Sequence, residues 1–409
     1  MASTITWLDY SERDRRRAVE VIRLFEEKGT VDELGIGSVR DAFANILFPG
    51  ISTIQSRAKY FLLIPWIYQA LEDKRVPSRE MAARARQAEL GLIDVLADSS
   101  DFAGTIGIVA RKGLKNLPSE IYWAGLGTWG IRLFPGSRDA YHRSMDGFYA
   151  SPSKTMVTDE LEAVHGRPAR NWHSGLPSPP SEFPRGVSLQ LTRLEAEYLR
   201  DRILIKRPGT FLAYLVAEGQ PADGVRFPWE HPQAMEAPEQ NRLQLFHARC
   251  FSEAMHGSVL IYNLMLAEKR GDGARSERYR QLLDEWYELL VSRATDFQRW
   301  DRAAFWDMVV SGGGGVTTPT RLFIDAWLNI ALGQRAETVA DDGAARQLVH
   351  ERERLLKRGY ARLDNQRALE NWGGASGVGQ LDYRWLPVAR DTIEDIQEGL
   401  GKERLHAAD

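Results

Sequence analysis

The fold of this chain is decided around residues 44–68, which read ANILFPGISTIQSRAKYFLLIPWIY. An apolar segment runs into the turn LFPG, where Pro49 cannot extend a helix and Gly50 can adopt the positive φ that ends one. Directly after the turn, Ser52 and Gln55 fit the S-x-x-Q capping box that begins a helix. The stretch therefore predicts a helix-turn-helix whose second helix starts at Ser52.

The outer face of this second predicted helix carries polar and basic side chains. Such residue types contact phosphates or base edges when a helix lies in the major groove of DNA. Capping alone also explains the serine and the glutamine, and helix corners are common in proteins that bind no nucleic acid. As a hypothesis, the residues that contact DNA here are Thr53, Ser56, Arg57 and Lys59.

The letters LFPG return at residues 133–136, after a predicted helix over Ser119–Leu133. The surrounding stretch is the most one-sided basic part of the chain, and Tyr and Trp residues are interleaved with its cations. Basic and aromatic residues together suit phosphate neutralisation and base stacking. A pair of helices with a tryptophan core and a charged rim is the alternative. The candidate DNA contacts are Arg111, Lys112, Lys115, Arg138, His142 and Arg143.

The composition indicates a globular protein with no membrane anchor. The 409 residues are 43% hydrophobic and 27% charged, and the formal net charge is −3. The N-terminal residues lack the apolar core of a signal peptide, and the longest apolar runs are about half the ~20 residues that a membrane helix needs. We therefore expect a cytoplasmic protein. The single cysteine, Cys250, excludes an internal disulfide and is expected to be structural.

Helical periodicity dominates, so the fold class is predicted to be mainly α. We expect a helical module with helix-turn-helix-like corners over residues 1–150, a Pro/Gly-rich connecting region with a short helix over 151–240, and a helical bundle over 241–409. The best strand candidate is Gly104–Arg111. Helices are predicted over Ser11–Lys28, Ser38–Leu47, Ser52–Ala70, Ser78–Leu96, Asn241–Lys269, Ser276–Trp300, Thr320–Leu332, Ala344–Trp372 and Leu386–Leu400.

No pattern of residues names a reaction. Glu253 and His256 form one E-x-x-H, whereas a di-iron bundle needs two such motifs and a zinc protease needs H-E-x-x-H. A nucleotide P-loop and a G-x-S-x-G elbow are also missing. The sequence therefore predicts no catalytic residue, metal ligand or cofactor, although an enzyme with an unrecognised site stays an alternative.

Several segments of the chain are similar to one bacterial family that is known only as a domain of unknown function. The similarity covers nearly the whole chain, and the first segment is the most distinctive. Members of that family are associated with gene neighbourhoods that carry anti-phage or restriction-like functions. The resemblance therefore implies a subunit that acts near DNA beside other defence proteins, and it assigns no catalytic residue. The segments that carry it are residues 32–68, 113–131, 251–268 and 373–385.

Three functions agree with these patterns. The first is a non-catalytic DNA-binding or adaptor subunit of a bacterial anti-phage defence complex. The second is a protein–protein scaffold without DNA contact, because twelve tryptophans is a high number for this length and tryptophan is enriched in binding hot spots. The third is a nuclease with an unrecognised site. Partner identity, base preference and oligomeric state are left open by the sequence.

Overall fold

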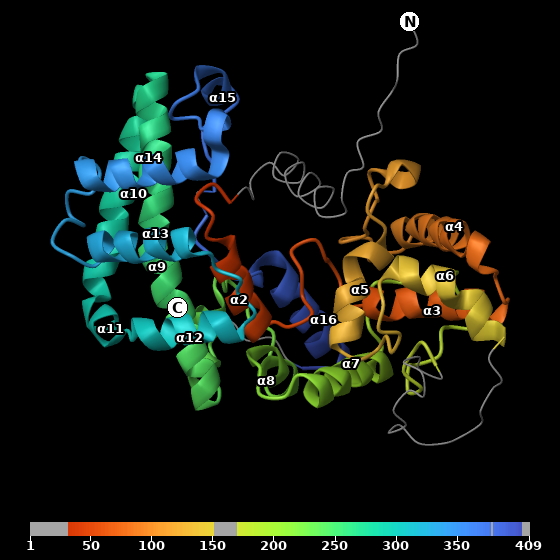
Figure 1. Cartoon of the computed structure of the whole chain (residues 1–409). Coiled ribbons are helices and arrows are strands. Elements are labelled where there is room, and N and C mark those ends of the chain that lie inside the picture. Colours follow the sequence, from red (N-terminus) through yellow and green to blue (C-terminus); the bar gives the residue numbers. More distant parts are fainter. Residues whose placement is uncertain (1–31, 151–169, 378, 403–409) are drawn as a thin grey trace, which may run out of the picture. The chain divides into compact units, whose positions relative to one another are not determined.

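The computed structural model of the chain describes residues 32–150, 170–377 and 379–402, and within these ranges the fold is mainly α-helical (Figure 1). The chain forms two compact units, each made of segments that are far apart in sequence. Unit 1 contains the chain up to Ala42 together with His247–Leu381, and unit 2 contains Phe43–Phe246 together with the chain from Asp382. From the sequence, three domains were predicted that follow one another along the chain.

Unit 2 is built from helices that pack in two groups. In the first group α4 packs against α3 and α6, and α5 packs against α3 and α6; in the second, α16 packs against α7 and α8. The α-helices of this unit are α3 (Tyr60–Asp73), α4 (Ser78–Ala97), α5 (Pro118–Thr128), α6 (Arg138–Ala150), α7 (Arg193–Lys206), α8 (Phe211–Ala217) and α16 (Arg390–Gly399). Its short helical turns are η1 (Arg111–Gly113), η2 (Pro228–Glu230), η3 (Ala234–Glu236) and η5 (Trp385–Ala389).

Four aromatic rings form the core of the first group. Tyr68 of α3, Trp123 of α5 and Tyr141 of α6 meet Trp172, which lies near the start of the described part of the connecting region. Every pair among these rings has centroids 5.4–6.0 Å apart, mostly tilted or edge-on, which is the arrangement that ring quadrupoles favour. The aromatic residues of the two predicted corners are therefore core residues.

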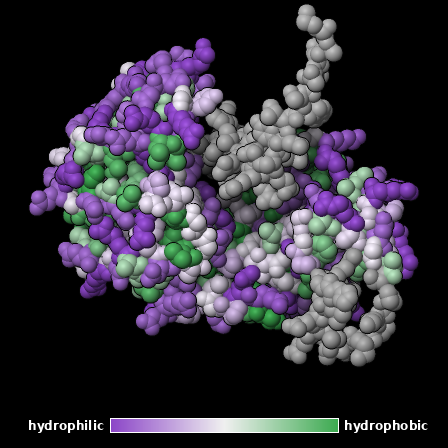
Figure 2. Space-filling view, in the orientation of Figure 1, coloured by the Kyte–Doolittle hydropathy of each residue, from purple (hydrophilic) through white to green (hydrophobic). Residues whose placement is uncertain are grey.

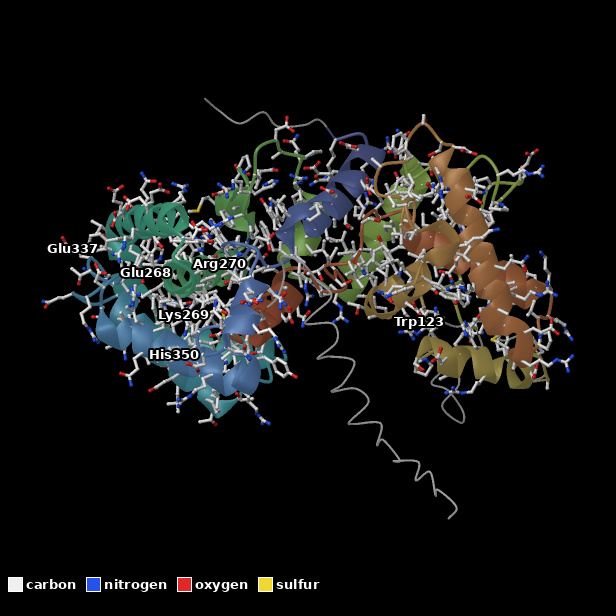
Figure 3. The ribbon with its side chains drawn as sticks, turned by 90° about the horizontal axis from the view of Figure 1, so that it is seen from above. Trp123, Glu268, Lys269, Arg270, Glu337 and His350 are labelled. Atoms are coloured by element: carbon white, nitrogen blue, oxygen red, sulfur yellow. The ribbon has the colours of Figure 1, made fainter. Side chains whose placement is uncertain are left out.

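Unit 1 is arranged around the long helix α9 (Glu239–Arg270), which begins in unit 2. Side chains at its end join it to later segments, and Figure 3 labels three of them. Glu268 accepts a hydrogen bond from Arg280, and Arg270 donates one to the carbonyl of Trp372 over 2.6 Å. The other helices are α10 (Gly273–Ser292), α11 (Ala294–Arg299), α12 (Arg302–Ser311), α13 (Thr318–Ala331), α14 (Gly343–Lys357), η4 (Arg358–Tyr360) and α15 (Gln366–Glu370), and α2 (Gly37–Leu47) begins in this unit.

Two buried tryptophans pack against the middle of α9 and hydrogen-bond to its backbone. The indole nitrogen of Trp286 donates to the carbonyl of Glu253 over 2.8 Å, and that of Trp327 donates to the carbonyl of Ala254 over 2.9 Å. Gly257 makes room for this contact, because a Cβ atom there would lie 2.5 Å from the ring of Trp286. The absence of a side chain at Gly257 thus allows the Trp286 ring of α10 to lie against the backbone of α9.

Most of the predicted helices are confirmed. Several predicted helix boundaries are wrong, and so is the predicted strand over Gly104–Arg111. Residues 104–111 form successive turns, and no strand of the described chain pairs with them. The predicted helix over Ser276–Trp300 is divided at Arg293 into α10 and α11. The one over Ala344–Trp372 stops at Lys357, where Arg358 adopts a positive φ of 50°. The predicted helix Ser11–Lys28 lies outside the described residues.

The Gly257→Ala substitution tests the contact between α9 and Trp286. The added methyl group overpacks the core, so we expect a loss of about 1–3 kcal/mol in the free energy of unfolding, measured by thermal or denaturant unfolding of the full chain. Gly91→Ala in α4 is the matched control, because nothing lies within 4 Å of a Cβ atom there. It should stabilise the chain by about 0.5–1 kcal/mol through helix propensity, and equal effects of both variants would contradict the packing.

Candidate nucleic-acid interface

The segment after the first LFPG turn is not a helix. The predicted start at Ser52 is wrong, because α3 begins at Tyr60. The backbone N–H of Ser52 does donate to the side chain of Gln55 over 3.1 Å, and the amide nitrogen of Gln55 donates to the carbonyl of Gly50, also over 3.1 Å. The capping-box pair therefore stabilises a tight turn. The helix itself starts later than predicted, at Tyr60 and not at Ser52.

Distant side chains hold the backbone of residues 56–58 in this non-helical form. The N–H of Ser56 donates to the hydroxyl of Tyr122 over 2.8 Å, and the N–H of Ala58 donates to the carboxylate of Asp395 over 2.8 Å. Groups that a helix would bond internally are thus bonded to α5 and α16. Tertiary hydrogen bonds have replaced the helical pattern that local propensity favours.

Arg57 lies in an ion-pair cluster and not on an open recognition surface. Its Nε donates to Asp395 over 2.8 Å, and its two terminal nitrogens donate to the two carboxylate oxygens of Asp101 over 3.0 Å each. Burial alone lowers the pKa of Arg57, but the hydrogen bonds and charges of both carboxylates raise it above its ordinary value. The guanidinium is therefore a fixed cation that joins residues 101 and 395 to the start of α3.

Lys59 is more deeply enclosed still. Its side chain is 6% exposed, its ammonium lies 2.6 Å from a carboxylate oxygen of Glu195, and it also donates to the carbonyl of Gln190 over 3.1 Å. The hydroxyl of Ser56 donates to the carbonyl of Gly104 over 2.7 Å. Among the four residues predicted to contact DNA here, only Thr53 is exposed. The first corner is a structural junction.

At the second corner, two of the predicted contacts also point inward. Arg138 donates to the hydroxyl of Ser119 over 3.0 Å and to the carboxylate of Glu120 over 2.5 Å. His142 is 5% exposed, and its Nε2 lies 3.1 Å from the hydroxyl of Tyr68. Burial lowers the pKa of His142 to about 4, so its imidazole is neutral at pH 7 and offers no charge to a phosphate.

Three of the remaining predicted contacts, Arg111, Lys112 and Lys115, are exposed, and together with the half-buried Arg86 of α4 they form what we call the basic edge. Arg86 of α4 fastens the segment, because it donates to the carbonyls of Lys112 over 3.3 Å and of Leu114 over 3.1 Å. Arg111 pairs with Asp94 of α4 over 2.8 Å, and both side chains are well exposed. Lys112 and Lys115 are exposed beside them, and Arg143 is exposed on α6, which also packs against α4.

The sequence pattern did not predict that Arg86 belongs to this edge. The spacing of Arg84 and Arg86 within a predicted helix gave no reason to connect them with residues 111–115. Only the fold connects Arg86 with residues 111–115, because η1 packs against α4. A count of basic residues in the stretch 79–86 was the one available signal.

Most tryptophan side chains pack in the core and contribute little to the protein surface. Ten of the twelve tryptophans are buried among the described residues, and Trp229 is half-buried. Trp123, labelled in Figure 3, lies in the aromatic core, donates to the carbonyl of Gly136 over 3.0 Å, and has the guanidinium of Arg132 4.8 Å from its ring. On the face that Figure 2 shows, hydrophobic atoms are scattered among hydrophilic ones. An exposed tryptophan docking surface, which the scaffold alternative used, has no support in these residues.

Among the described residues, the single E-x-x-H is not part of a cluster that could hold a metal ion. Within residues 32–150, 170–377 and 379–402, no group of three His, Cys, Asp or Glu side chains could hold a metal ion. Trp300 donates to His247 over 3.0 Å, and burial lowers the pKa of His256 to about 4. Burial raises the pKa of Cys250 to about 12, so this thiol is protonated at pH 7, as a structural cysteine is expected to be.

One comparison with known proteins places the chain. The model of a family of unknown function, DUF6361, matches residues 2–398. The chain belongs to this family. No curated protein and no solved structure matches it. Within the described residues of this DUF6361 member, the helices are all too short or too polar to cross a lipid bilayer. The family assignment confirms the resemblance seen in the sequence and assigns no activity.

Replacing Lys59 with methionine should separate the structural cations from the exposed ones. The variant leaves the Glu195 carboxylate buried without its partner, so we expect a loss of about 3–5 kcal/mol in the free energy of unfolding. Lys112→Met, the matched control on the exposed basic edge, should change it by less than about 0.5 kcal/mol. Denaturant unfolding measures both, and similar losses in the two variants would contradict the assignment of Lys59 to a buried pair.

The depressed pKa of His142 predicts a pH dependence of stability. The unfolded chain binds this proton near pH 6.5 and the folded chain only near pH 4, so the contribution is present above pH 6.5 and is lost as the pH falls toward 4. Between pH 7 and 5 the loss should be about 2 kcal/mol. His142→Phe should flatten this part of the pH–stability curve, whereas Arg143→Gln should not, and an unchanged slope in His142→Phe would contradict the prediction.

Proposed function

We propose that this DUF6361 protein is a non-catalytic DNA-binding or adaptor subunit of a bacterial anti-phage defence complex, and that DNA is contacted at the basic edge. The observation that carries the proposal is the geometry of η1, where Arg111, Lys112 and Lys115 are all exposed on one short segment. Arg86 holds that segment on α4. The resemblance to a family associated with defence gene neighbourhoods supports DNA as the partner.

The local charge supports phosphate binding although the whole chain is slightly acidic. Exposed cations that neutralise phosphates release condensed counterions, and this supplies most non-specific DNA affinity. Asp94 is the carboxylate paired with this edge, through Arg111. An exposed pair of this kind contributes only about 0–1 kcal/mol, so Arg111 can exchange Asp94 for a phosphate at little cost.

The fixed backbone of the edge also favours binding. Arg86 donates to the carbonyl of Lys112 within η1 and to that of Leu114 directly after it, and the N–H of Leu114 bonds to the carbonyl of Arg111 over 3.0 Å. Because these bonds order the backbone of the segment beforehand, DNA binding would not have to order that backbone. Phosphate contacts of this type position a protein on DNA without reading its sequence. The proposal is therefore for binding with little base preference.

The double variant Lys112→Gln/Lys115→Gln tests the proposal. Fluorescence anisotropy with labelled duplex and single-stranded DNA, repeated across salt concentrations, gives the slope of log K against log salt. We expect the variant to bind more weakly and its slope to become shallower by about 0.9 for each duplex phosphate contact that is lost. The wild type and the double variant should have the same melting temperature, which shows that the variant is folded.

Lys74→Gln/Lys206→Gln is the matched control, because it removes two exposed lysines of unit 2 that lie outside the basic edge. It should keep the wild-type affinity and salt slope. No DNA binding by the wild type at low salt, or equal losses in the two double variants, would overturn the proposal. Metal-dependent degradation of the DNA by purified protein would instead favour a nuclease and contradict the non-catalytic role.

A further inference from the structure

The loop between α4 and α5 exposes an aromatic ring on the same segment of chain that carries the basic edge. Phe102 is 54% exposed, and among the described aromatic residues of unit 2 it alone is exposed. Val109, which is 94% exposed, adds an apolar side chain just before Arg111. Single exposed apolar residues are common on protein surfaces, so the position of this ring matters more than its exposure.

The loop begins and ends at the last turn of α4. The N–H of Ser99 bonds to the carbonyl of Leu96 where the chain leaves the helix, and Arg111 returns to pair with Asp94 over 2.8 Å. Between these two points the backbone makes successive turns. Phe102 and the cations of the basic edge therefore lie in one loop that is held at both ends to the same end of α4.

Arg57 fixes the backbone on both sides of Phe102. Its guanidinium donates to the two carboxylate oxygens of Asp101 over 3.0 Å each, and to the carbonyl of Ala103 over 3.0 Å. The carbonyl of Phe102 itself accepts a bond from the N–H of Thr105 over 3.1 Å. The backbone is thus ordered while the ring remains exposed, so a partner that covers the ring does not have to order the loop.

We propose that Phe102 stacks on a base of single-stranded DNA whose phosphates lie along the basic edge, so that the protein selects single strands over duplex. This inference rests on the proposed function and names the form of DNA that the same edge binds. Aromatic stacking combined with a cationic surface is the common mode of single-strand binding without sequence preference, because every base has a π face. In a duplex the neighbouring base pairs cover those faces.

The charges of the loop separate the part that attracts phosphates from the part that stacks. Asp101 is paired with Arg57, but Asp98 is an exposed carboxylate that repels phosphates near the start of the loop. The exposed lysines Lys112 and Lys115 lie at its other end, on η1 and shortly after it. Electrostatic attraction is therefore concentrated on the basic edge, and at Phe102 the affinity has to come from the uncharged contact with a base.

Fluorescence anisotropy of the full chain tests the proposal with three labelled probes of equal length: an oligothymidine strand, a duplex and an abasic strand. The abasic strand keeps the phosphates and lacks the bases. We expect the wild type to bind oligothymidine more tightly than the duplex and about tenfold more tightly than the abasic strand. Phe102→Ala should lose about tenfold in affinity for oligothymidine and should bind the abasic strand as the wild type does.

Two further variants show whether the aromatic ring itself is responsible. Phe102→Tyr keeps a ring that can stack and should bind oligothymidine as the wild type does. Leu194→Ala is the matched control, because it truncates an apolar side chain on α7 that is 65% exposed and lies outside the loop. It should change neither affinity, and all three variants should keep the wild-type melting temperature.

The outcomes distinguish this inference from the proposed function. No binding of any probe by the wild type would overturn both. Binding that depends on Lys112 and Lys115 but is unchanged in Phe102→Ala would overturn the stacking alone. An equal loss for oligothymidine and the abasic strand in Phe102→Ala would also overturn it, because the ring would then act without a base. Phe102-dependent binding to phosphatidylserine vesicles, without binding to oligothymidine, would assign the ring to a membrane surface instead.

Discussion

The ion pairs of Arg57 and Lys59 are the interaction on which the rest of unit 2 depends. They connect the short segment before α3 to Asp101, Asp395 and Glu195, residues that lie 44 to 338 positions away along the chain. Moving these charges out of water is expensive, and it is offset only because each carboxylate meets a cation with good geometry and further donors. The pairs therefore specify where α7 and α16 meet the start of α3 and make that junction intolerant of losing one partner.

This junction also determines which basic residues remain available to a partner molecule. The cations nearest the first LFPG turn are half-buried or buried in ion pairs, whereas Arg111, Lys112 and Lys115 of the basic edge are exposed to solvent. Burial decides the difference, because a desolvated ammonium such as that of Lys59 must keep its counter-ion and an exposed one can exchange it for a phosphate. The same residue type thus has opposite roles within one compact unit.

The aromatic core also holds the carboxyl group of Glu72, a residue of α3. Tyr141 and Trp172 belong to the four-ring cluster, and their polar atoms lie at its edge, where they both donate to Glu72. Aromatic side chains with a polar atom commonly occupy such a boundary, since the ring packs and the polar group needs a partner. The aromatic core thus fixes the orientation of the Glu72 carboxyl group through its own polar atoms.

The sequence by itself determined the helical class and most helix positions. Periodic apolar residues predicted α4 and α13 to within a few residues, and the proline and glycine of LFPG marked the end of α2 correctly. It also indicated that residues 111–115 are basic. Only the tertiary structure decided that residues 52–59 are not helical, because Tyr122 and Asp395 bond their backbone amides. The reason is physical: capping and periodicity act over three or four residues, whereas burial and ion pairing depend on segments that meet only after folding.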